Sequence, residues 1–325
     1  PPPVVLAKGK RVFVWDVEGN KYYDFLSAYS AVNQGHSHPK IVDALVNQAQ
    51  KLALTSRAFY NANLGEYEKK ITELFGFDKV LPMNSGAEAV ETAVKLARKW
   101  SYEVKGVPQN AAKIVVCENN FHGRTTTIVS FSNDPDANNN YGPFTPGFIK
   151  IPYNDLKALE ETLANDSENI AAFLVEPIQG EAGVYVPDEG FLKSASELCK
   201  KYNVLLIADE VQTGIARTGK LIACHHENVQ PDILILGKAL SGGMYPVSAV
   251  LADDEIMNVI HPGQHGSTFG GNPVACAVAV AALDVVEEEK LSERAEELGQ
   301  IFRNEIEKLI EKTDLITGVR GKGLL

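Results

Sequence analysis

The stretch Ile233-Leu-Ile-Leu236-Gly-Lys238-Ala-Leu-Ser-Gly-Gly243 places a lysine between a short apolar run and a glycine-rich turn. Four consecutive apolar residues that end at glycine predict a buried strand. A lysine at the end of such a strand is partly withdrawn from water, which favours the neutral, nucleophilic form of its amine. The stretch therefore predicts a reactive lysine at the edge of a sheet.

Five more apolar runs alternate with helical stretches from Lys79 onward. This alternation predicts an α/β fold in which a mostly parallel sheet is covered by helices on both faces. Ligands of open parallel sheets bind at the carboxyl ends of the strands, so the residues that follow each run are candidates for chemistry. The five runs are Lys79–Met83, Lys113–Cys117, Ala171–Val175, Val204–Ala208 and Val247–Leu251.

The two ends of the chain differ from this middle part. Val12–Phe25 alternates around Glu18-Gly19-Asn20, which predicts a β-hairpin, and Leu291–Leu309 has one apolar face, which predicts a long helix. A strand is expected to begin within Gly321–Leu325, and we expect the C-terminal domain to continue beyond it. We divide the chain into an N-terminal segment, a large domain and the start of a C-terminal small domain, at residues 1–29, 30–277 and 278–325.

Composition limits the classes of function. The 325 residues carry a net charge of −11, whereas nucleic acid and anionic membranes bind basic surfaces, so neither is an expected partner. The four cysteines are scattered, which favours a reducing compartment; we expect the cytoplasm, with the mitochondrial matrix as the alternative. His36-Ser37-His38 is followed by Pro39 without a carboxylate cluster, so no metal site is predicted.

A carboxylate follows the apolar run that precedes the lysine-bearing one in the sequence. Its chemistry complements that of the lysine. Asp209 comes directly after Val204–Ala208; alone, it is typical of a helix cap or a structural ion pair. Together, Asp209 and Lys238 match what pyridoxal phosphate requires. The lysine condenses with the aldehyde of the cofactor, and the acid pairs with its protonated ring nitrogen.

Two further strand ends suit the rest of such a cofactor. Asn84-Ser85-Gly86-Ala87 opens a predicted helix that extends to Trp100, and small residues there leave N–H groups free for a phosphate. Phe121-His122-Gly123-Arg124 follows the run that ends at Cys117, and its aromatic ring could stack on the cofactor. Each motif alone is also typical of a cap or a core; only the combination is informative.

Over essentially its whole length the chain resembles the class III aminotransferases, which are fold-type I pyridoxal-phosphate enzymes. This resemblance implies a seven-stranded sheet and a smaller α+β domain made from both chain ends. The narrower match, to ornithine-type members, lies in Phe25–His36, Leu54–Phe59 and Val175–Gly183. The general match lies in Asn84–Ala89, Phe121–Arg124, Asp209–Gly214, Leu236–Gly243 and Gly266–Pro273.

The resemblance also implies roles around the cofactor. Lys238 would bind it covalently and carry a proton, Asp209 would hold its ring nitrogen, and Gln212 would bond its ring oxygen. Phe121 would stack on the ring beside His122. The phosphate would be bound by Ser85, Gly86 and Ala87 of one subunit and by Ser267 and Thr268 of its neighbour, so a homodimer with shared sites is expected.

For the substrate, the resemblance implies that Arg124 binds a carboxylate and that Tyr29 lies near the α-amino group of ornithine. Glu181 would mask an arginine, expected beyond Leu325, until glutamate displaces it. The implied reaction moves the δ-amino group of ornithine to 2-oxoglutarate, in arginine and proline metabolism. Alternatives are an acetylornithine or 4-aminobutyrate aminotransferase, a pyridoxal-phosphate mutase or racemase, and a non-catalytic binding protein built on the same fold.

Overall fold

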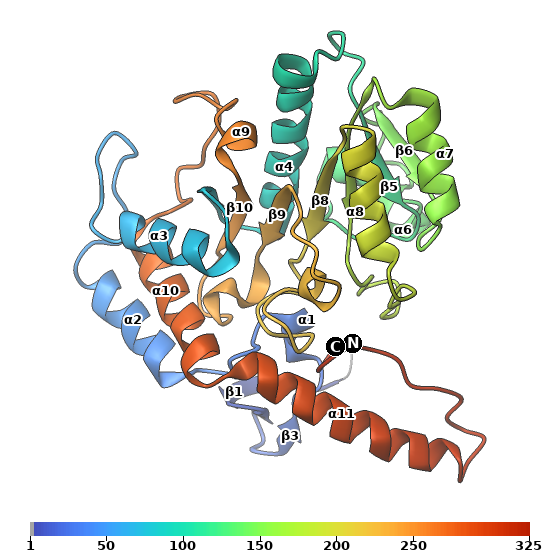
Figure 1. Cartoon of the computed structure of the whole chain (residues 1–325). Coiled ribbons are helices and arrows are strands. Elements are labelled where there is room, and N and C mark those ends of the chain that lie inside the picture. The colour runs from blue at the N-terminus through green and yellow to red at the C-terminus, as the bar shows by residue number, and fades with distance from the viewer. Residues whose placement is uncertain (1–2) are drawn as a thin grey trace.

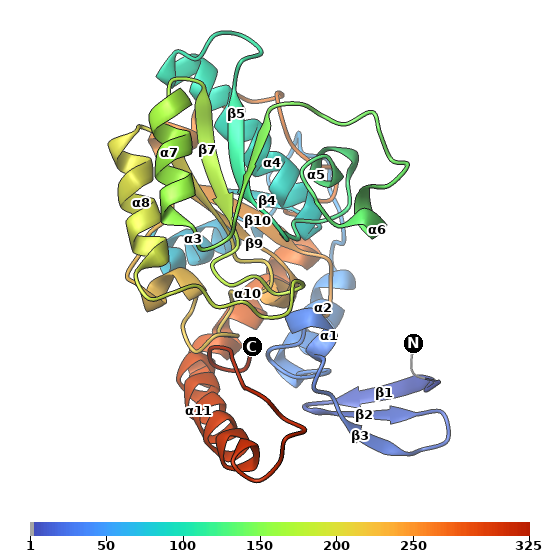
Figure 2. The same cartoon turned by 90° about the vertical axis from the view of Figure 1, so that its right-hand side faces the viewer.

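A computed structural model describes residues 3–325, so Pro1 and Pro2 of the N-terminal segment lie outside the described residues. Its centre is a seven-stranded sheet in the order β4-β10-β9-β8-β7-β5-β6 (Figures 1 and 2). The predicted α/β sheet is confirmed, and one further strand, β6, was not predicted. The strands are β4 Lys79–Met83, β5 Lys113–Cys117, β6 Phe148–Ile151, β7 Ile170–Val175, β8 Leu205–Asp209, β9 Ile233–Leu236 and β10 Ser248–Ala252.

Helices cover both faces of this sheet, and an apolar core fills each interface. Residues of α3, α7, α8 and α10 contribute to one core, and residues of α4, α5 and α9 contribute to the other. All residues of β7 and β9 are buried, which explains their unbroken apolar sequence. The helices are α2 Pro39–Ala49, α3 Leu64–Phe75, α4 Gly86–Trp100, α5 Thr126–Val129, α6 Pro135–Asn138, α7 Leu156–Asp166, α8 Phe191–Lys201, α9 Asp254–Met257, α10 Pro273–Glu288 and α11 Leu291–Ile310.

Strand β10 is the antiparallel member of the sheet. It pairs antiparallel with both β4 and β9. The remaining neighbours pair parallel: β9 with β8, β8 with β7, β7 with β5, and β5 with β6. Strand β4 therefore points the same way as the parallel strands on the other side of β10. As a result, the residues that follow β4, β5, β7, β8 and β9 all lie at one edge of the sheet.

The two ends of the chain lie at the same end of the large sheet, where Figure 2 shows α11 and a small antiparallel sheet. That sheet is formed by β1 Leu6–Lys10, β2 Phe13–Asp16 and β3 Lys21–Tyr23, which confirms the hairpin. Helix α10 runs unbroken through residues 277 and 278, which favours a domain boundary after Glu288. The division into domains stays a prediction.

The prediction that a strand begins within Gly321–Leu325 is wrong. These residues form a turn, in which Lys322 N donates to Leu325 O and Leu325 N donates to Lys322 O. The turn is wedged between α11 and the loop at Thr218. A Cβ at Gly323 would lie 2.3 Å from the carbonyl carbon of Thr218, and one at Gly299 would lie 1.9 Å from Gly323 O. Only glycines permit backbones to approach so closely.

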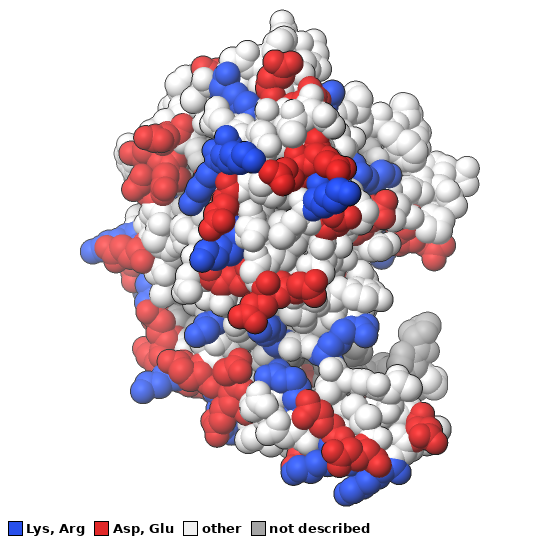
Figure 3. All heavy atoms as spheres, turned by 45° about the vertical axis from the view of Figure 1, so that its right-hand side comes forward, with Lys and Arg blue, Asp and Glu red and all other residues white. Residues whose placement is uncertain are grey.

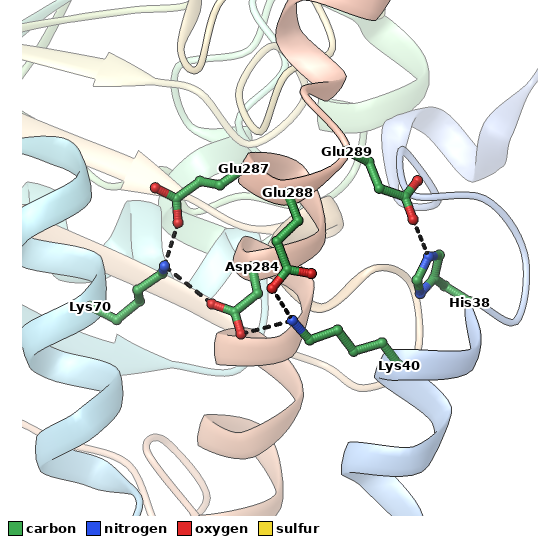
Figure 4. Close-up of polar contacts among 7 residues, drawn as sticks. All are labelled: His38, Lys40, Lys70, Asp284, Glu287, Glu288 and Glu289. Carbon is green, nitrogen blue, oxygen red and sulfur yellow. Dashed lines mark hydrogen bonds and ion pairs between the residues drawn. The ribbon is translucent and has the colours of Figure 1, made fainter.

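Helix α10 ends in acidic side chains, although a helix C-terminus favours cations. Cations from two other helices compensate, as Figure 4 shows. Lys40 Nζ of α2 lies 3.1 Å from Asp284 and 2.6 Å from Glu288, and Lys70 of α3 also pairs with Asp284. These ion pairs connect α2 and α3 to the C-terminal end of α10, which explains why charged residues lie at these helix contacts.

Charges of both signs are interspersed over the face drawn in Figure 3. Among the described residues, no helix has both the length and the apolarity needed to cross a membrane. The two histidines of the His36-Ser37-His38 motif bond to separate carboxylates, His36 to Asp24 at 2.7 Å and His38 to Glu289 at 2.9 Å.

Candidate active site

A cavity of about 180 Å³ opens at the edge where the strand ends meet. Its walls come from the residues after β4, β5, β7, β8 and β9, as the strand directions require. Seven residues predicted from the sequence line it together: Gly86, Ala87, Phe121, His122, Asp209, Gln212 and Lys238. Five further lining residues were not predicted from the sequence: Gly123, Glu176, Ile178, Val211 and Thr213.

The helix α4 begins at the cavity with a capping box. Ser85 Oγ accepts from Glu88 N, and Glu88 Oε2 accepts from Ser85 N at 2.9 Å and Asn84 N at 3.0 Å. The box occupies the N–H of Ser85, which caps the helix and does not line the cavity. The next two N–H groups, of Gly86 and Ala87, have no partner within the helix, and both residues line the cavity, so these groups are available to bind an anion.

Lys238 begins the short helix Lys238–Ser241, and only Gly237 separates it from the end of β9. Its φ is +44°, a left-handed conformation that costs a residue with a side chain about 1 kcal/mol or more. Burial lowers the pKa of its ammonium group, although the charges of Asp209, Glu181 and Glu176 act in the opposite direction. The amine thus lies in a strained, partly desolvated position on the cavity wall, as a nucleophilic lysine requires.

Asp209 and His122 form a buried pair that also lines the cavity. His122 Nδ1 lies 2.7 Å from Asp209 Oδ2, while Val211 N donates to Asp209 Oδ1 at 3.1 Å. Burial alone would lower the pKa of His122, but the hydrogen bond and charge of Asp209 and the charge of Glu176 raise it overall. His122 Nε2 is buried without a hydrogen-bond partner among the described residues.

Glu176 is a functional candidate that the sequence analysis missed. It follows β7 directly, so its position after an apolar run is the sequence signal that marks it. Its side chain is buried and accepts a hydrogen bond from Phe121 N at 3.0 Å. Burial raises its pKa to about 7, against the lowering effect of His122. The carboxyl group fixes the backbone of the aromatic residue that forms one wall of the cavity.

Arg124 and Tyr29 lie outside the cavity. Arg124 lines a second cavity of about 300 Å³, and its guanidinium lies 5.8 Å from the centre of the Phe121 ring, which lines the first cavity. Tyr29 is exposed within the short helical segment α1, Ser27–Ser30, whose four residues all have positive φ. Such a run of left-handed residues is strained and is typical of functional segments.

Ser267 and Thr268 also lie outside the cavity of their own chain. Ser267 Oγ accepts from Asn84 Nδ2 at 2.8 Å, next to the start of α4. Thr268 lines a separate cavity of about 270 Å³ together with residues 55–61. Near it, Phe59 and Tyr60 are 72% and 103% exposed, which is unusual for aromatic side chains.

Glu181 lies at the mouth of the cavity. Its Oε1 accepts from Gln212 Nε2 at 3.1 Å, and its charge acts on Lys238. A Cβ at Gly180 would lie 1.5 Å from Gln212 Oε1, so a glycine is needed here to give Gln212 its position. The contact brings together two residues to which the sequence assigns separate roles, one toward the cofactor and one toward the substrate.

The donor set suits pyridoxal phosphate. A lysine amine, a carboxylate with its own hydrogen-bond partners, an aromatic side chain and two free N–H groups at a helix start converge on one cavity. These are the groups that the aldehyde, the ring nitrogen, the ring face and the phosphate of the cofactor require. The fold and the site thus define an enzyme that uses this cofactor.

Comparisons with known proteins agree. The family model "Aminotransferase class-III" matches residues 1–325. The mitochondrial ornithine aminotransferase of Drosophila melanogaster is 65% identical over 100% of this chain and 74% of its own length. An acetylornithine aminotransferase structure from Elizabethkingia anophelis is 78% identical, with a TM-score of 0.90, over 99% of this chain and 78% of that one.

A structure of the ornithine aminotransferase from Toxoplasma gondii has a TM-score of 0.97 and 55% identity, over 99% of this chain and 76% of that one. Pyridoxal phosphate partially occupies the active site of that protein. The chain belongs to the class III aminotransferases. It is a pyridoxal-phosphate-dependent transferase of amino groups, as the sequence predicts.

Proposed function

We propose that this enzyme is an ornithine aminotransferase, which transfers the δ-amino group of ornithine to 2-oxoglutarate. The products are glutamate and glutamate semialdehyde, which cyclises to pyrroline-5-carboxylate. The observation that carries the proposal is the position of Glu181, a carboxylate at the cavity mouth whose charge acts on Lys238. The ornithine aminotransferase from Drosophila melanogaster supports it, since it matches the whole chain.

When bound, pyridoxal phosphate supplies an aldehyde that takes up the amino group and a ring that accepts electrons. The residues of the chain do the rest. Asp209, fixed by His122 and Val211 N, holds a negative charge where the ring nitrogen would be protonated. Lys238 Nζ, which burial favours in its neutral form, takes a proton from the substrate carbon that bears the amino group and later returns one.

Glu181 would allow one pocket to accept two substrates of different charge. Ornithine brings a second cation into the pocket, whereas glutamate brings a second carboxylate, and one pocket must accept both. A glutamate that pairs reversibly with an arginine hides that cation from ornithine and releases it for glutamate. Opening the pair consumes free energy, which reduces the apparent affinity for glutamate.

The experiment compares single-turnover rates with ornithine and with glutamate for the wild type and Glu181→Ala. The variant should raise the rate with glutamate relative to the rate with ornithine, and the absorption spectrum of the bound cofactor should not change. A ratio that stays at the wild-type value would show that Glu181 does not gate the pocket. Absence of any ornithine turnover by the wild type would refute the proposed function itself.

An acetylornithine aminotransferase is the second candidate. The structure from Elizabethkingia anophelis, which is 78% identical, carries that name. The two substrates differ in the charge of the α-nitrogen, because acetylation removes the cation. A paired assay of ornithine and N-acetylornithine distinguishes them: a higher kcat/KM with N-acetylornithine would favour this second candidate.

The assembly and the compartment are also proposals. We propose a homodimer in which Ser267 and Thr268 reach the phosphate of the neighbouring subunit, because Thr268 does not line the cavity of its own chain. We propose the cytoplasm, where the four buried, free cysteines would remain reduced. The mitochondrial matrix is the alternative, which the name of the Drosophila melanogaster relative favours.

A further inference from the structure

The turn that carries Glu181 has a strained backbone. Gln179 and Tyr185 pair across it, with N–H···O distances of 3.1 and 2.9 Å. Between them, Gly183 and Val184 both have positive φ, +121° and +57°. A β-branched valine in the left-handed region is a conformational outlier that persists only when its surroundings hold it. The residues Gln179–Tyr185, which we call the Glu181 turn, therefore need an external support.

Arg320 supplies such a support. Its Nε donates to Gly183 O and Val184 O, both at 3.0 Å, and its Nη2 donates to Gly183 O at 2.7 Å. The guanidinium carbon also lies 4.8 Å from the centre of the Tyr185 ring. The hydrogen bonds hold the carbonyls of the two residues with positive φ, so the arginine grips the strained part of the turn.

Within residues 3–325, the side chain of Arg320 donates hydrogen bonds only to the carbonyls of Gly183 and Val184. No carboxylate within residues 3–325 lies within 4.0 Å of it. A charged donor strengthens a hydrogen bond to about twice that of a neutral donor. The planar fork can reach two neighbouring carbonyls at once, whereas the single ammonium of a lysine has no such fixed geometry.

Arg320 belongs to the segment after α11, far from the turn in sequence. That segment is fixed to the large domain by a second arginine contact, in which Leu324 N donates to Arg217 O at 3.0 Å and Arg217 Nη1 donates to Leu324 O at 3.2 Å. The close approach of Gly299 to Gly323 fixes it to α11 as well. The C-terminal segment thus reaches the mouth of the active site through one side chain.

We propose that Arg320 is a positioning residue that determines substrate preference by fixing the Glu181 turn. Glu181 can act as a gate only if its backbone is held so that the carboxylate returns to one position, which in this structure lies beside Gln212. Within residues 3–325 no other side chain donates to the carbonyls of Gly183 and Val184. The inference rests on the proposed function, because it assigns the turn a role in selecting between ornithine and glutamate. Loss of Arg320 should impair the ornithine half-reaction more than the glutamate half-reaction.

The test uses Arg320→Ala and Arg320→Lys in the holoenzyme, with Arg294→Gln as a matched control. Arg294 lies on the exposed side of α11, and its one ion pair among the described residues is with Glu297, at 2.8 Å. The first readout is hydrogen exchange of the peptide that spans Gln179–Tyr185. Exchange should accelerate roughly tenfold or more in Arg320→Ala and partly in Arg320→Lys, since charged hydrogen bonds are lost. Arg294→Gln should match the wild type.

The second readout is the ratio of single-turnover rates with glutamate and ornithine. Arg320→Ala should raise it in the same direction as Glu181→Ala, and the double variant should show no further rise, because both changes act through one carboxylate. Unchanged exchange, an unchanged ratio, or additive effects in the double variant would each overturn the inference. A wild type without ornithine turnover would instead refute the proposed function, and accelerated exchange would still show that Arg320 holds the turn.

Discussion

Lys238 is the residue on which activity depends most directly. Lys238→Ala should fold normally and lose turnover by roughly 10²–10⁴-fold or more, because the amine that moves the proton is absent. Borohydride reduction of the wild-type holoenzyme followed by peptide mapping should find the pyridoxyl group on Lys238. A label on Lys105, which is also partly buried, would contradict the assignment.

Asp209 and Glu210 are adjacent carboxylates with different tasks. Asp209 lines the cavity, whereas Glu210 is fully buried and accepts from Cys224 N at 2.8 Å and from the hydroxyl of Thr213. Asp209→Asn keeps the contact with His122 and should reduce kcat/KM by roughly 10²–10³-fold with little change in Tm.

Glu210→Ala should do the reverse, since it leaves buried donors without an acceptor at a cost of about 1–3 kcal/mol each. Its Tm should fall while the folded fraction keeps most of its activity. Thermal melts and assays of both variants decide the matter: similar profiles for the two would remove the distinction.

Glu176 should make the stability of the cofactor-free protein depend on pH. Its pKa is about 7 in the folded protein, above the ordinary value of 4.5 for a glutamate, so the folded protein binds this proton more tightly than the unfolded chain does. The stability that the protonated group contributes is complete below pH 4.5 and is lost as the pH rises to about 7, by at most about 3 kcal/mol.

The measurement is Tm against pH for the cofactor-free wild type and Glu176→Gln, which cannot ionise. The advantage of the wild type over the variant should shrink between about pH 4.5 and pH 7 and then stay constant. A difference that is flat with pH would mean that Glu176 titrates normally.

At this scale, the sequence predicts the side chains that follow strands, because parallel strands bring their ends together whatever their lengths. Phe121, Asp209 and Lys238 were found in this way, and Glu176 could have been. Arg320 could not, since it binds carbonyl groups, which every residue possesses, across 137 positions of the chain. Contacts of this kind leave no pattern of residue types.

At the scale of the elements, the packing of α11 against the C-terminal turn depends on Gly299. Alanine usually stabilises a helix by about 1 kcal/mol relative to glycine, but a Cβ at Gly299 would lie 1.9 Å from Gly323 O. Gly299→Ala should therefore reduce stability, by about 1–3 kcal/mol, as the C-terminal turn is displaced. Denaturant unfolding measures the change.

Gly65 in α3 provides the control, because nothing lies within 4 Å of a Cβ there. Gly65→Ala should be neutral or stabilising, by up to about 1 kcal/mol. If the two substitutions shifted the unfolding midpoint equally, the close packing of α11 on the C-terminal turn would not matter for stability.

The elements themselves were predicted where one signal dominates. Apolar runs identified β4, β5 and β9 to the residue, and a periodic apolar face identified α11 to within one residue. The strand expected at Gly321–Leu325 does not form, because its two glycines disfavour an extended strand and permit a tight turn. The decisive contact, with Gly299 and Thr218, is tertiary and cannot be seen in the local sequence.

For the whole molecule, the proposed shared site can be tested by mixing subunits. Lys238→Ala subunits and Ser267→Ala/Thr268→Ala subunits are each expected to have low activity. In a mixed dimer, one site would combine an intact Lys238 with intact Ser267 and Thr268 from the partner. Activity should therefore rise on mixing, and each variant should sediment as a dimer. No recovery from mixed dimers of confirmed composition would place both hydroxyls in the site of their own subunit.

The order of the sheet has a consequence for synthesis on the ribosome. Met83 of β4 pairs with Ser248 of β10, which follows it by 165 residues (248 − 83), and β4 has no other neighbour within the described sheet. At about 5–20 residues per second, β4 must wait roughly 10–30 s for its partner to be translated. Until then, the apolar face of α4 has no complete surface to cover, so the nascent chain is a natural client for chaperones that bind exposed apolar segments.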